Sequence, residues 1–161
     1  IASQTIPILA IAPMIIVVLG SIGIIGLFPK AIISTYLCFF PVVVGMVKGL
    51  RSPDKILLDL MNSYSASKVQ VFWKLRMPAS IPYLFASLKI AIALSIVGAI
   101  VAELPAGAQA GLGARLLSGS YYGQTSLIWA ALLTASVVSA TLVSVVGRME
   151  QSIIKRMGLQ T

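Results

Sequence analysis

Histidine is absent from this chain of 161 residues, and cysteine occurs once, at Cys38 inside an apolar run. A Cys/His metal site needs several such ligands and a disulfide needs two cysteines, so the composition excludes both. Acidic residues are also scarce, because four Asp and Glu stand against twelve Lys and Arg. An enzyme embedded in a membrane needs His, Cys or paired carboxylates near its spans, and the spans here hold no His, one isolated Cys and no acid pair, which argues against such an enzyme.

Apolar residues are abundant instead. They make up 58% of the chain, only 10% of the residues are charged, and the mean hydropathy is +1.01. This is the composition of a membrane protein. The net charge of +8 is gathered in one central stretch and at the C-terminus, between apolar runs. A nucleic-acid binder needs its basic groups on a water-facing surface, so this distribution argues against one.

Four stretches approach the length of about 20 apolar residues that a transmembrane helix needs. They are residues 6–28, 31–47, 81–102 and 126–147. Pro7, Pro13 and Pro41 fall within the first two, where we interpret them as kinks because neighbouring helices can satisfy the freed backbone groups. The sequence therefore predicts an all-α, polytopic transmembrane bundle with four spans.

The basic residues predict how this bundle is oriented, because Lys and Arg favour the cytoplasmic side. Six of them lie between the second and third spans and three follow the fourth, whereas only Lys30 and Arg115 lie on the other side. We expect residues 48–80 and the C-terminus to be cytoplasmic, residues 107–124 external, and Ile1 cytoplasmic. The chain lacks an initiator Met, and its first apolar run begins almost at once, so we expect a fragment of a longer membrane protein.

Small residues recur every four positions in the third and fourth spans. They are Ser87, Ala91, Ser95 and Ala99 in one span, and Ala131, Ala135 and Ser139 in the other. Such faces are typical of close helix packing in lipid, and the alternative is that part of a face lines a path for a substrate. Gly45-x-x-x-Gly49 is a weaker signal of the same kind, because it straddles a predicted membrane boundary.

Two charged residues within or beside the third span each allow two interpretations. Lys89 either extends its side chain to the cytoplasmic interface or contacts a substrate or a lipid phosphate. Glu103 either ends the helix in solvent or belongs to a gate or an external contact. The sequence favours the first interpretation of each.

The cytoplasmic segment 52–78 predicts two short helices. Ser52 suits an N-cap, Pro53 the first helical position and Asp54 the positive end of the helix dipole. One apolar stripe follows, made of Ile56, Leu57, Leu60, Met61 and Tyr64. A second helix is expected from Ser67 and should end before Pro78. Such a pair either lies in the lipid interface or docks on a protein partner.

The spacing within this segment matches a known signature. The segment resembles the EAA motif of binding-protein-dependent ABC importer permeases. The matching pieces are Asp59-Leu60-Met61, then Ser65 after three residues, then Leu75-Arg76-Met77-Pro78 after nine more. Residues 65–82 and short pieces at 3–13, 39–41, 101–103 and 111–113 resemble the nitrate/sulfonate/taurine-type permeases. This chain has Ser65 at a position where the motif has Gly. Glycine permits a sharp turn there because it has no Cβ atom. Serine can hold a turn through its hydroxyl, so we expect a bend of different geometry.

The resemblance implies a MetI-like permease fold, with residues 1–161 as one transmembrane permease domain that lacks its N-terminal spans. It implies a coupling loop at 52–78 that docks on a separate ATP-binding subunit. The residues expected at that contact are Asp59, Leu60, Met61, Tyr64, Ser65, Ala66, Phe72, Leu75, Met77 and Pro78.

The resemblance further implies a bacterial inner-membrane protein that works with a second permease copy, an extracytoplasmic solute-binding protein and membrane lipid. The chain has no G-x-x-x-x-G-K-[ST] phosphate loop, so ATP is expected on the partner and no cofactor on this chain. The solute would be small: nitrate, a sulfonate, taurine or a vitamin precursor. The alternative is a passive channel or structural scaffold without ATP coupling.

Overall fold

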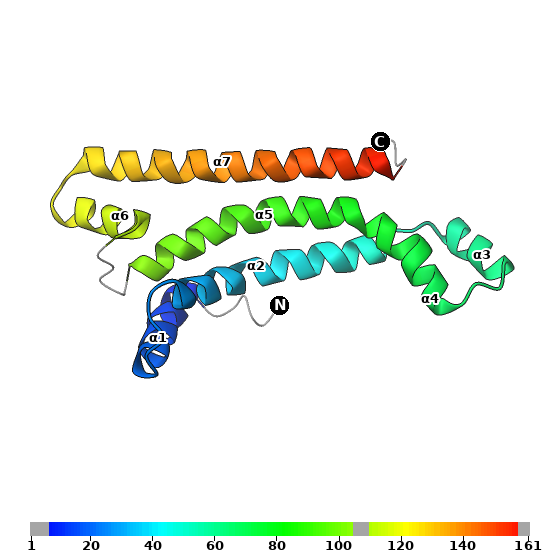
Figure 1. The fold of residues 1–161 in the computed structure, drawn as a ribbon, viewed down its shortest axis with the longest axis horizontal. Helices are drawn as coiled ribbons and strands as arrows, with labels where there is room; N and C mark the ends of the chain where they lie inside the picture. The colour runs from blue at the N-terminus through cyan, green and yellow to red at the C-terminus, as the bar shows by residue number, and fades with distance from the viewer. Residues whose placement is uncertain (1–6, 105–109, 158–161) are drawn as a thin grey trace. The chain divides into compact units, whose positions relative to one another are not determined.

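The structure is a computed structural model that describes residues 7–104 and 110–157. The described residues form helices and turns and contain no strand, which confirms the predicted all-α class. The elements in chain order are α1 (Ile8–Ser21), α2 (Leu27–Leu50), α3 (Lys55–Ser63), α4 (Lys68–Val71), the π-helix η2 (Phe72–Arg76), α5 (Met77–Glu103), α6 (Leu112–Tyr121) and α7 (Thr125–Arg156) (Figure 1).

Among the described residues, three helices are long and apolar enough to cross a bilayer. They are α2, α7 and the continuous helix Lys68–Glu103, which joins α4, η2 and α5. They contain the predicted spans 31–47, 81–102 and 126–147. The structure does not confirm the predicted count of four spans, because α1 has 14 residues. At 1.5 Å per residue that is about 21 Å, shorter than a hydrocarbon core of about 30 Å.

The first predicted span, residues 6–28, is wrong in its bounds. Helix α1 ends at Ser21, and α2 already begins at Leu27. The turn between them contains Gly23 and Gly26 with φ of 80° and 83°, a conformation that side chains with a Cβ rarely adopt. Apolar composition continues through this turn, so hydropathy alone could not locate it. Ile1 lies outside the described residues.

Pro78 does not end the second cytoplasmic helix, contrary to our prediction. The helix widens into the π-turn η2 directly before the proline and continues as α5 to Glu103. In a regular α-helix the proline ring would collide with the carbonyl of Lys74. A wider turn at this point, with the Met77 amide donating to the Phe72 carbonyl, lets the helix continue.

The chain divides into two compact units, residues 1–40 with 91–144 and residues 41–90 with 145–161. The described part of the first unit has a small core in which Ala12, Ile33 and Ala102 are almost completely buried. In the same unit the Ser34 hydroxyl donates to the Ser95 carbonyl at 3.1 Å. The Cys38 thiol donates to the Ala91 carbonyl at 2.9 Å. Ala91 and Ser95 thus serve helix packing, the interpretation that the sequence favoured.

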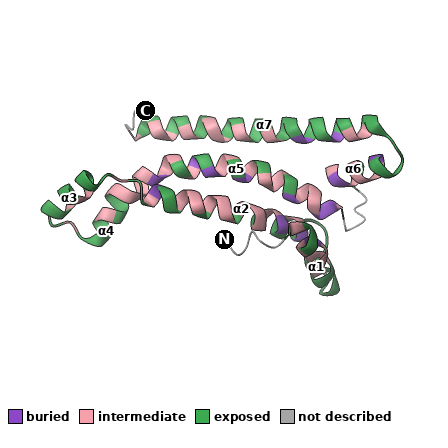
Figure 2. Ribbon diagram, turned by 180° about the vertical axis from the view of Figure 1, so that it is seen from behind, coloured by how far each residue is buried: buried purple, intermediate pink, exposed green. Residues whose placement is uncertain are grey.

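In the second unit α2 and α5 approach closely through Gly45 and Gly49. A Cβ atom on Gly45 would lie 2.5 Å from the Ser87 Cβ, and one on Gly49 would lie 2.8 Å from the Ser80 Cα. The glycine pair is therefore a close packing contact, although the sequence made it a weak signal. Much of α3 and α7 remains exposed (Figure 2), including Trp129, Leu133 and Val137 of α7.

Candidate functional site

The candidate site is the pair of short helices α3 and α4 with the turn between them. Asp54 is the N-cap of α3, and its carboxylate accepts from the Ile56 amide at 3.3 Å. We expected Ser52 to be the cap, but its hydroxyl donates to the Gly49 carbonyl at 2.7 Å instead. Asp54 can serve both as cap and as a negative charge at the positive end of the dipole. The helix therefore begins two residues later than the sequence indicated.

Helix α3 ends in a Schellman motif centred on Ser65. Its amide donates to the Asn62 carbonyl at 2.8 Å, and the Ala66 amide donates to the Met61 carbonyl at 3.0 Å. Ser65 has a φ of 52° and is the one non-glycine residue with positive φ in the described chain. This is the position at which glycine is usual, since it has no Cβ to clash. Backbone hydrogen bonds hold the bend, whereas we expected the serine hydroxyl to do so.

The second helix begins where the sequence predicted. The Ser67 hydroxyl accepts from the Gln70 amide at 3.3 Å, and the Gln70 side-chain oxygen accepts from the Ser67 amide at 2.8 Å. This reciprocal capping box satisfies two amides that a helix start otherwise leaves free. The α3–α4 hairpin (residues 54–71) is therefore closed by local interactions at its turn and at both helix starts.

The apolar stripe of α3 has little cover within its own unit. Tyr64 is 77% exposed, Ile56 73% and Leu60 50%, whereas Met61 is half-buried. On the other side of the turn Trp73 is also exposed and packs edge-to-face against Phe72, with ring centroids 5.5 Å apart. Apolar side chains presented together in this way mark a surface that binds another protein or lipid.

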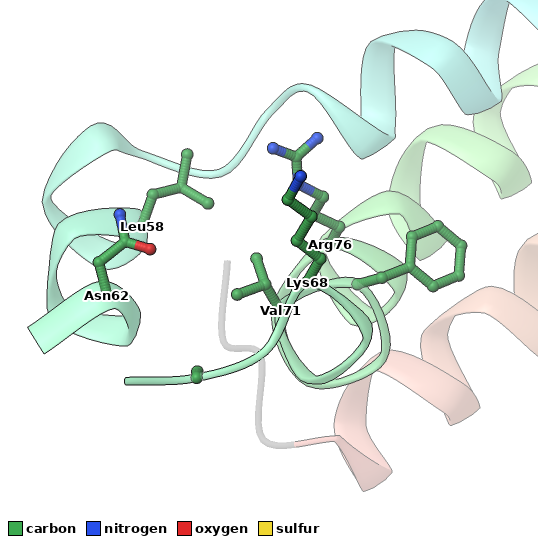
Figure 3. A pocket seen from close by; sticks show the side chains of 7 residues that line it. Leu58, Asn62, Lys68, Val71 and Arg76 are labelled. Carbon is green, nitrogen blue, oxygen red and sulfur yellow. The ribbon is translucent and has the colours of Figure 1, made fainter. Parts of the chain in front are cut away.

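Between α3 and the helix that follows lies a pocket of about 490 Å³, in which Leu58 and Asn62 face Lys68, Val71 and Arg76 (Figure 3). Two predicted contact residues, Ala66 and Phe72, also line it. Sequence reasoning missed the other five. The available signal was the spacing of Leu58 and Asn62 by one helical turn, on the side of α3 next to the exposed stripe.

The remaining predicted residues are spread along the hairpin and into α5. Asp59, Leu60, Tyr64, Ser65 and Phe72 are exposed, whereas Met61, Ala66, Leu75, Met77 and Pro78 are half-buried. The pocket carries two positive charges, since neither Lys68 nor Arg76 belongs to the two ion pairs found in residues 7–104 and 110–157. It suits an acidic group. No cluster of His, Cys, Asp and Glu that could hold a metal occurs in the described residues.

Two ion pairs lie outside the hairpin, one in each unit. The Glu103 carboxylate is buried, accepts from the Lys30 ammonium at 2.8 Å and accepts from the Gly113 amide at 2.6 Å. The prediction that Glu103 ends its helix in solvent is therefore wrong. Lys89 pairs with Glu150 of α7 instead of extending alone to the interface. The partners are 73 and 61 residues apart, so no local pattern could reveal them.

Comparison with known proteins connects this architecture to a family of membrane transport proteins. The sequence profile of the family described as binding-protein-dependent transport system inner membrane component matches residues 1–159. No solved structure matches the chain significantly.

Several curated permeases are similar over most of this chain. The riboflavin transport system permease protein RibX of Chloroflexus aurantiacus is 31% identical over 154 residues, which cover 96% of this chain and 56% of RibX. The formylaminopyrimidine transport permease protein ThiX of Halalkalibacterium halodurans is 35% identical, over 70% of this chain and 43% of ThiX. The taurine transport system permease protein TauC of Escherichia coli is 26% identical, over 84% and 48%. The chain thus spans about half the length of these relatives.

Proposed function

The chain belongs to the binding-protein-dependent transport system inner membrane components, and from that premise we propose that it couples the import of a small solute to ATP hydrolysis by a separate subunit. Its relatives are transport permeases, so the chain is a transport subunit and not an enzyme. In this proposal ATP binds to the partner subunit, and this chain needs no cofactor of its own.

The observation that carries the coupling role is the α3–α4 hairpin, with its capped ends and exposed apolar stripe. A movement of the ATPase can reach the membrane only through a segment that keeps its shape. The Schellman turn and the capping box provide that local order. The continuous helix Lys68–Glu103 then leads from the hairpin into a span without a break. A displacement of α4 by the ATPase is thus transmitted along one helix into the membrane.

The chemistry of the ATPase surface follows from the hairpin. The stripe of Ile56, Leu60 and Tyr64 calls for an apolar groove, in the helix-in-groove mode of recognition. Asp59 is exposed one residue before Leu60 and calls for a basic side chain at the rim of that groove. In this proposal the coupling contact extends from Asp59 to Pro78, and the apolar anchors of α3 lie at its N-terminal end.

The assembly we propose contains two permease copies, two ATP-binding subunits and an extracytoplasmic solute-binding protein. Residues 48–80 and the C-terminus face the cytoplasm of a bacterium, and α2, the helix containing α5, and α7 cross its inner membrane. The relatives are named for riboflavin, formylaminopyrimidine and taurine, which supports a small solute of the vitamin-precursor or sulfonate class. We assign no residue to its binding.

The proposal is tested by reconstituting the full-length permease with its ATPase and binding protein in liposomes. Replacing Asp59 by Lys or Ala66 by Trp should abolish ATP-dependent uptake while the protein still inserts into the membrane. Lys55→Gln is the matched control, because Lys55 is exposed on the same helix but lies outside the apolar stripe. Unchanged uptake in both variants would contradict the coupling role.

The same liposomes distinguish the rival function. In the wild-type assembly a passive channel would show solute flux of equal rate with and without ATP, and a structural scaffold would show no flux in either condition. An importer shows flux only with hydrolysable ATP and loaded binding protein.

A further inference from the structure

Glu103, the last residue of α5, has a carboxylate that is held from two sides. Its side chain is 11% exposed, it accepts a hydrogen bond from the Lys30 ammonium of α2 at 2.8 Å, and it accepts another from the Gly113 amide of α6 at 2.6 Å. All three residues belong to the first unit. One carboxylate therefore connects three helices.

The start of α6 is shaped to receive this carboxylate. Gly111 is the N-cap, with a φ of 137°, and a Cβ atom there would overlap the carboxyl group of Glu103. A Cβ atom on Gly113 would lie 2.5 Å from the Ile100 carbonyl oxygen and 2.8 Å from the Glu103 Cβ. The amides in the first turn of a helix lack partners within it, and the helix dipole makes this end positive. Glu103 supplies both the acceptor and the negative charge.

The other end of α6 is held as well. Gly119 is buried, and a Cβ atom there would lie 2.8 Å from the Ile128 Cγ1 of α7. Both buried residues of α6 are thus glycines, one packed against α5 and the other against α7. Arg115, in contrast, is exposed. The small residues let α6 lie directly on its neighbours, and Glu103 provides the polar contact that fixes where it starts.

We infer that Glu103 is a positioning residue of the transport cycle: it fixes α6 to α5 and α2, so that these helix ends move together when solute is delivered from outside. This inference rests on the proposed import function and on the external location of α6. The bond to α6 is the essential one, and Lys30 serves as the counter-ion that makes a buried carboxylate tolerable.

A charge exchange separates this role from that of a plain ion pair. In the double variant Lys30→Glu with Glu103→Lys, the two opposite charges are retained. The lysine at 103, however, can only donate hydrogen bonds and would place a positive charge at the positive end of α6. A plain ion pair should be restored by the exchange, whereas the positioning role should remain lost.

The first experiment measures uptake and ATP hydrolysis of the full permease, reconstituted with its ATPase and binding protein. In Glu103→Ala, and equally in the charge exchange, stimulation of hydrolysis by loaded binding protein should fall about tenfold or more, as expected for loss of a hydrogen bond to a charged group. Basal hydrolysis should stay near the wild-type rate. The single variants Lys30→Met and Glu103→Gln both keep an acceptor for the Gly113 amide, so each should lose less of the stimulation than Glu103→Ala does.

The second experiment follows α6 itself and does not depend on transport. Arg115→Cys is introduced into a Cys38→Ser background, and its reaction with a membrane-impermeant maleimide is timed. Adding Glu103→Ala should speed the reaction, because α6 is then less firmly held. Adding Glu150→Ala instead is the matched control, since Glu150 is the other ion-paired glutamate but belongs to the second unit.

Three outcomes would overturn the inference: rescue of stimulation by the charge exchange, full stimulation in Glu103→Ala, or a labelling rate in Glu103→Ala equal to that of the control. A wild-type assembly without ATP-dependent uptake would instead overturn the proposed function. The labelling result would still report whether Glu103 fixes α6.

Discussion

At the scale of single residues, Ser65 shows what a motif position requires. The EAA signature has glycine where this chain has serine, and the structure places that serine at the C′ position of a Schellman motif with a φ of 52°. This position therefore requires a backbone conformation with positive φ, and the identity of the side chain matters less. Serine meets the demand at a cost, because the left-handed region is unfavourable by about 1–2 kcal/mol for residues with a Cβ.

We therefore expect Ser65→Gly to stabilise the protein by about 1 kcal/mol or less, since the relieved strain is partly offset by the greater freedom of glycine in the unfolded chain. Thermal unfolding of the purified permease in detergent measures the change. Ser63→Gly is the control: Ser63 lies in the last turn of α3 and has no positive φ, so glycine there should destabilise by about 0.5–1 kcal/mol. A lower midpoint for Ser65→Gly would contradict the strain.

At the scale of elements, the packing of α2 on α5 depends on glycine at particular positions. Gly49 has the Ser80 Cα 2.8 Å from its hypothetical Cβ, whereas the nearest atom to such a Cβ on Gly147 of α7 is the end of the Lys89 side chain, at 3.8 Å. The first neighbour is backbone and cannot move aside. Both glycines lie within helices of the second unit.

The two glycines should consequently respond to alanine with opposite signs. Alanine is favoured over glycine inside a helix by about 1 kcal/mol, so Gly147→Ala should raise the unfolding midpoint. Gly49→Ala should lower it, because the helices must separate and lose contacts along their interface. Thermal unfolding of both variants in one detergent checks the signs. Stabilisation by both would mean that α2 and α5 pack less closely than described.

The elements also show where local sequence information is sufficient. The helices containing the predicted spans at 31–47, 81–102 and 126–147 follow from apolar length, and the start of α4 follows from its capping box. Helix α6 was missed inside a loop expected at 107–124. Its first turn has no side-chain cap of its own, since its N-cap is Gly111 and the carboxylate comes from Glu103 on another helix.

At the scale of the whole molecule, charges within the apolar part are paired across long stretches of sequence. Lys89 and Glu150 connect α5 to α7 within the second unit, and their side chains are 35% and 17% exposed. Removing one partner leaves the other charge partly desolvated and unpaired. The resulting loss in the free energy of unfolding is larger than the net stabilisation that the intact pair provides.

We expect Lys89→Met and Glu150→Gln to destabilise the protein individually, and the double variant to be more stable than the sum of the two losses implies. The interaction energy in this double-mutant cycle should be about 1 kcal/mol. Detergent unfolding of the four proteins measures it. Strict additivity would show that the two side chains do not interact, and Ser152→Ala on the exposed side of α7 controls for nonspecific effects.

The orientation of the permease is a further prediction at this scale. In a Cys38→Ser background, a cysteine replacing Arg115 should react with an impermeant maleimide in intact cells, because α6 is expected outside. A cysteine replacing Ser152 should react only after the membrane is permeabilised, because it lies between Arg148 and Arg156 on the predicted cytoplasmic side. The reverse pattern would invert the topology and place the proposed coupling loop on the side of the membrane away from the proposed ATPase.

The sequence by itself determined the membrane class, the apolar spans inside the three long helices and the presence of a helical pair at 52–78, because hydropathy and capping are properties of neighbouring residues. Only the tertiary structure decided that Gly23 and Gly26 divide the first apolar run, that the helix continues through Pro78, and that Glu103 meets Lys30 and α6. The reason is physical: hydropathy does not report a backbone conformation such as the positive φ of Gly23 and Gly26, and a buried charge is defined by its partner, which for Glu103 is Lys30, 73 residues away along the chain.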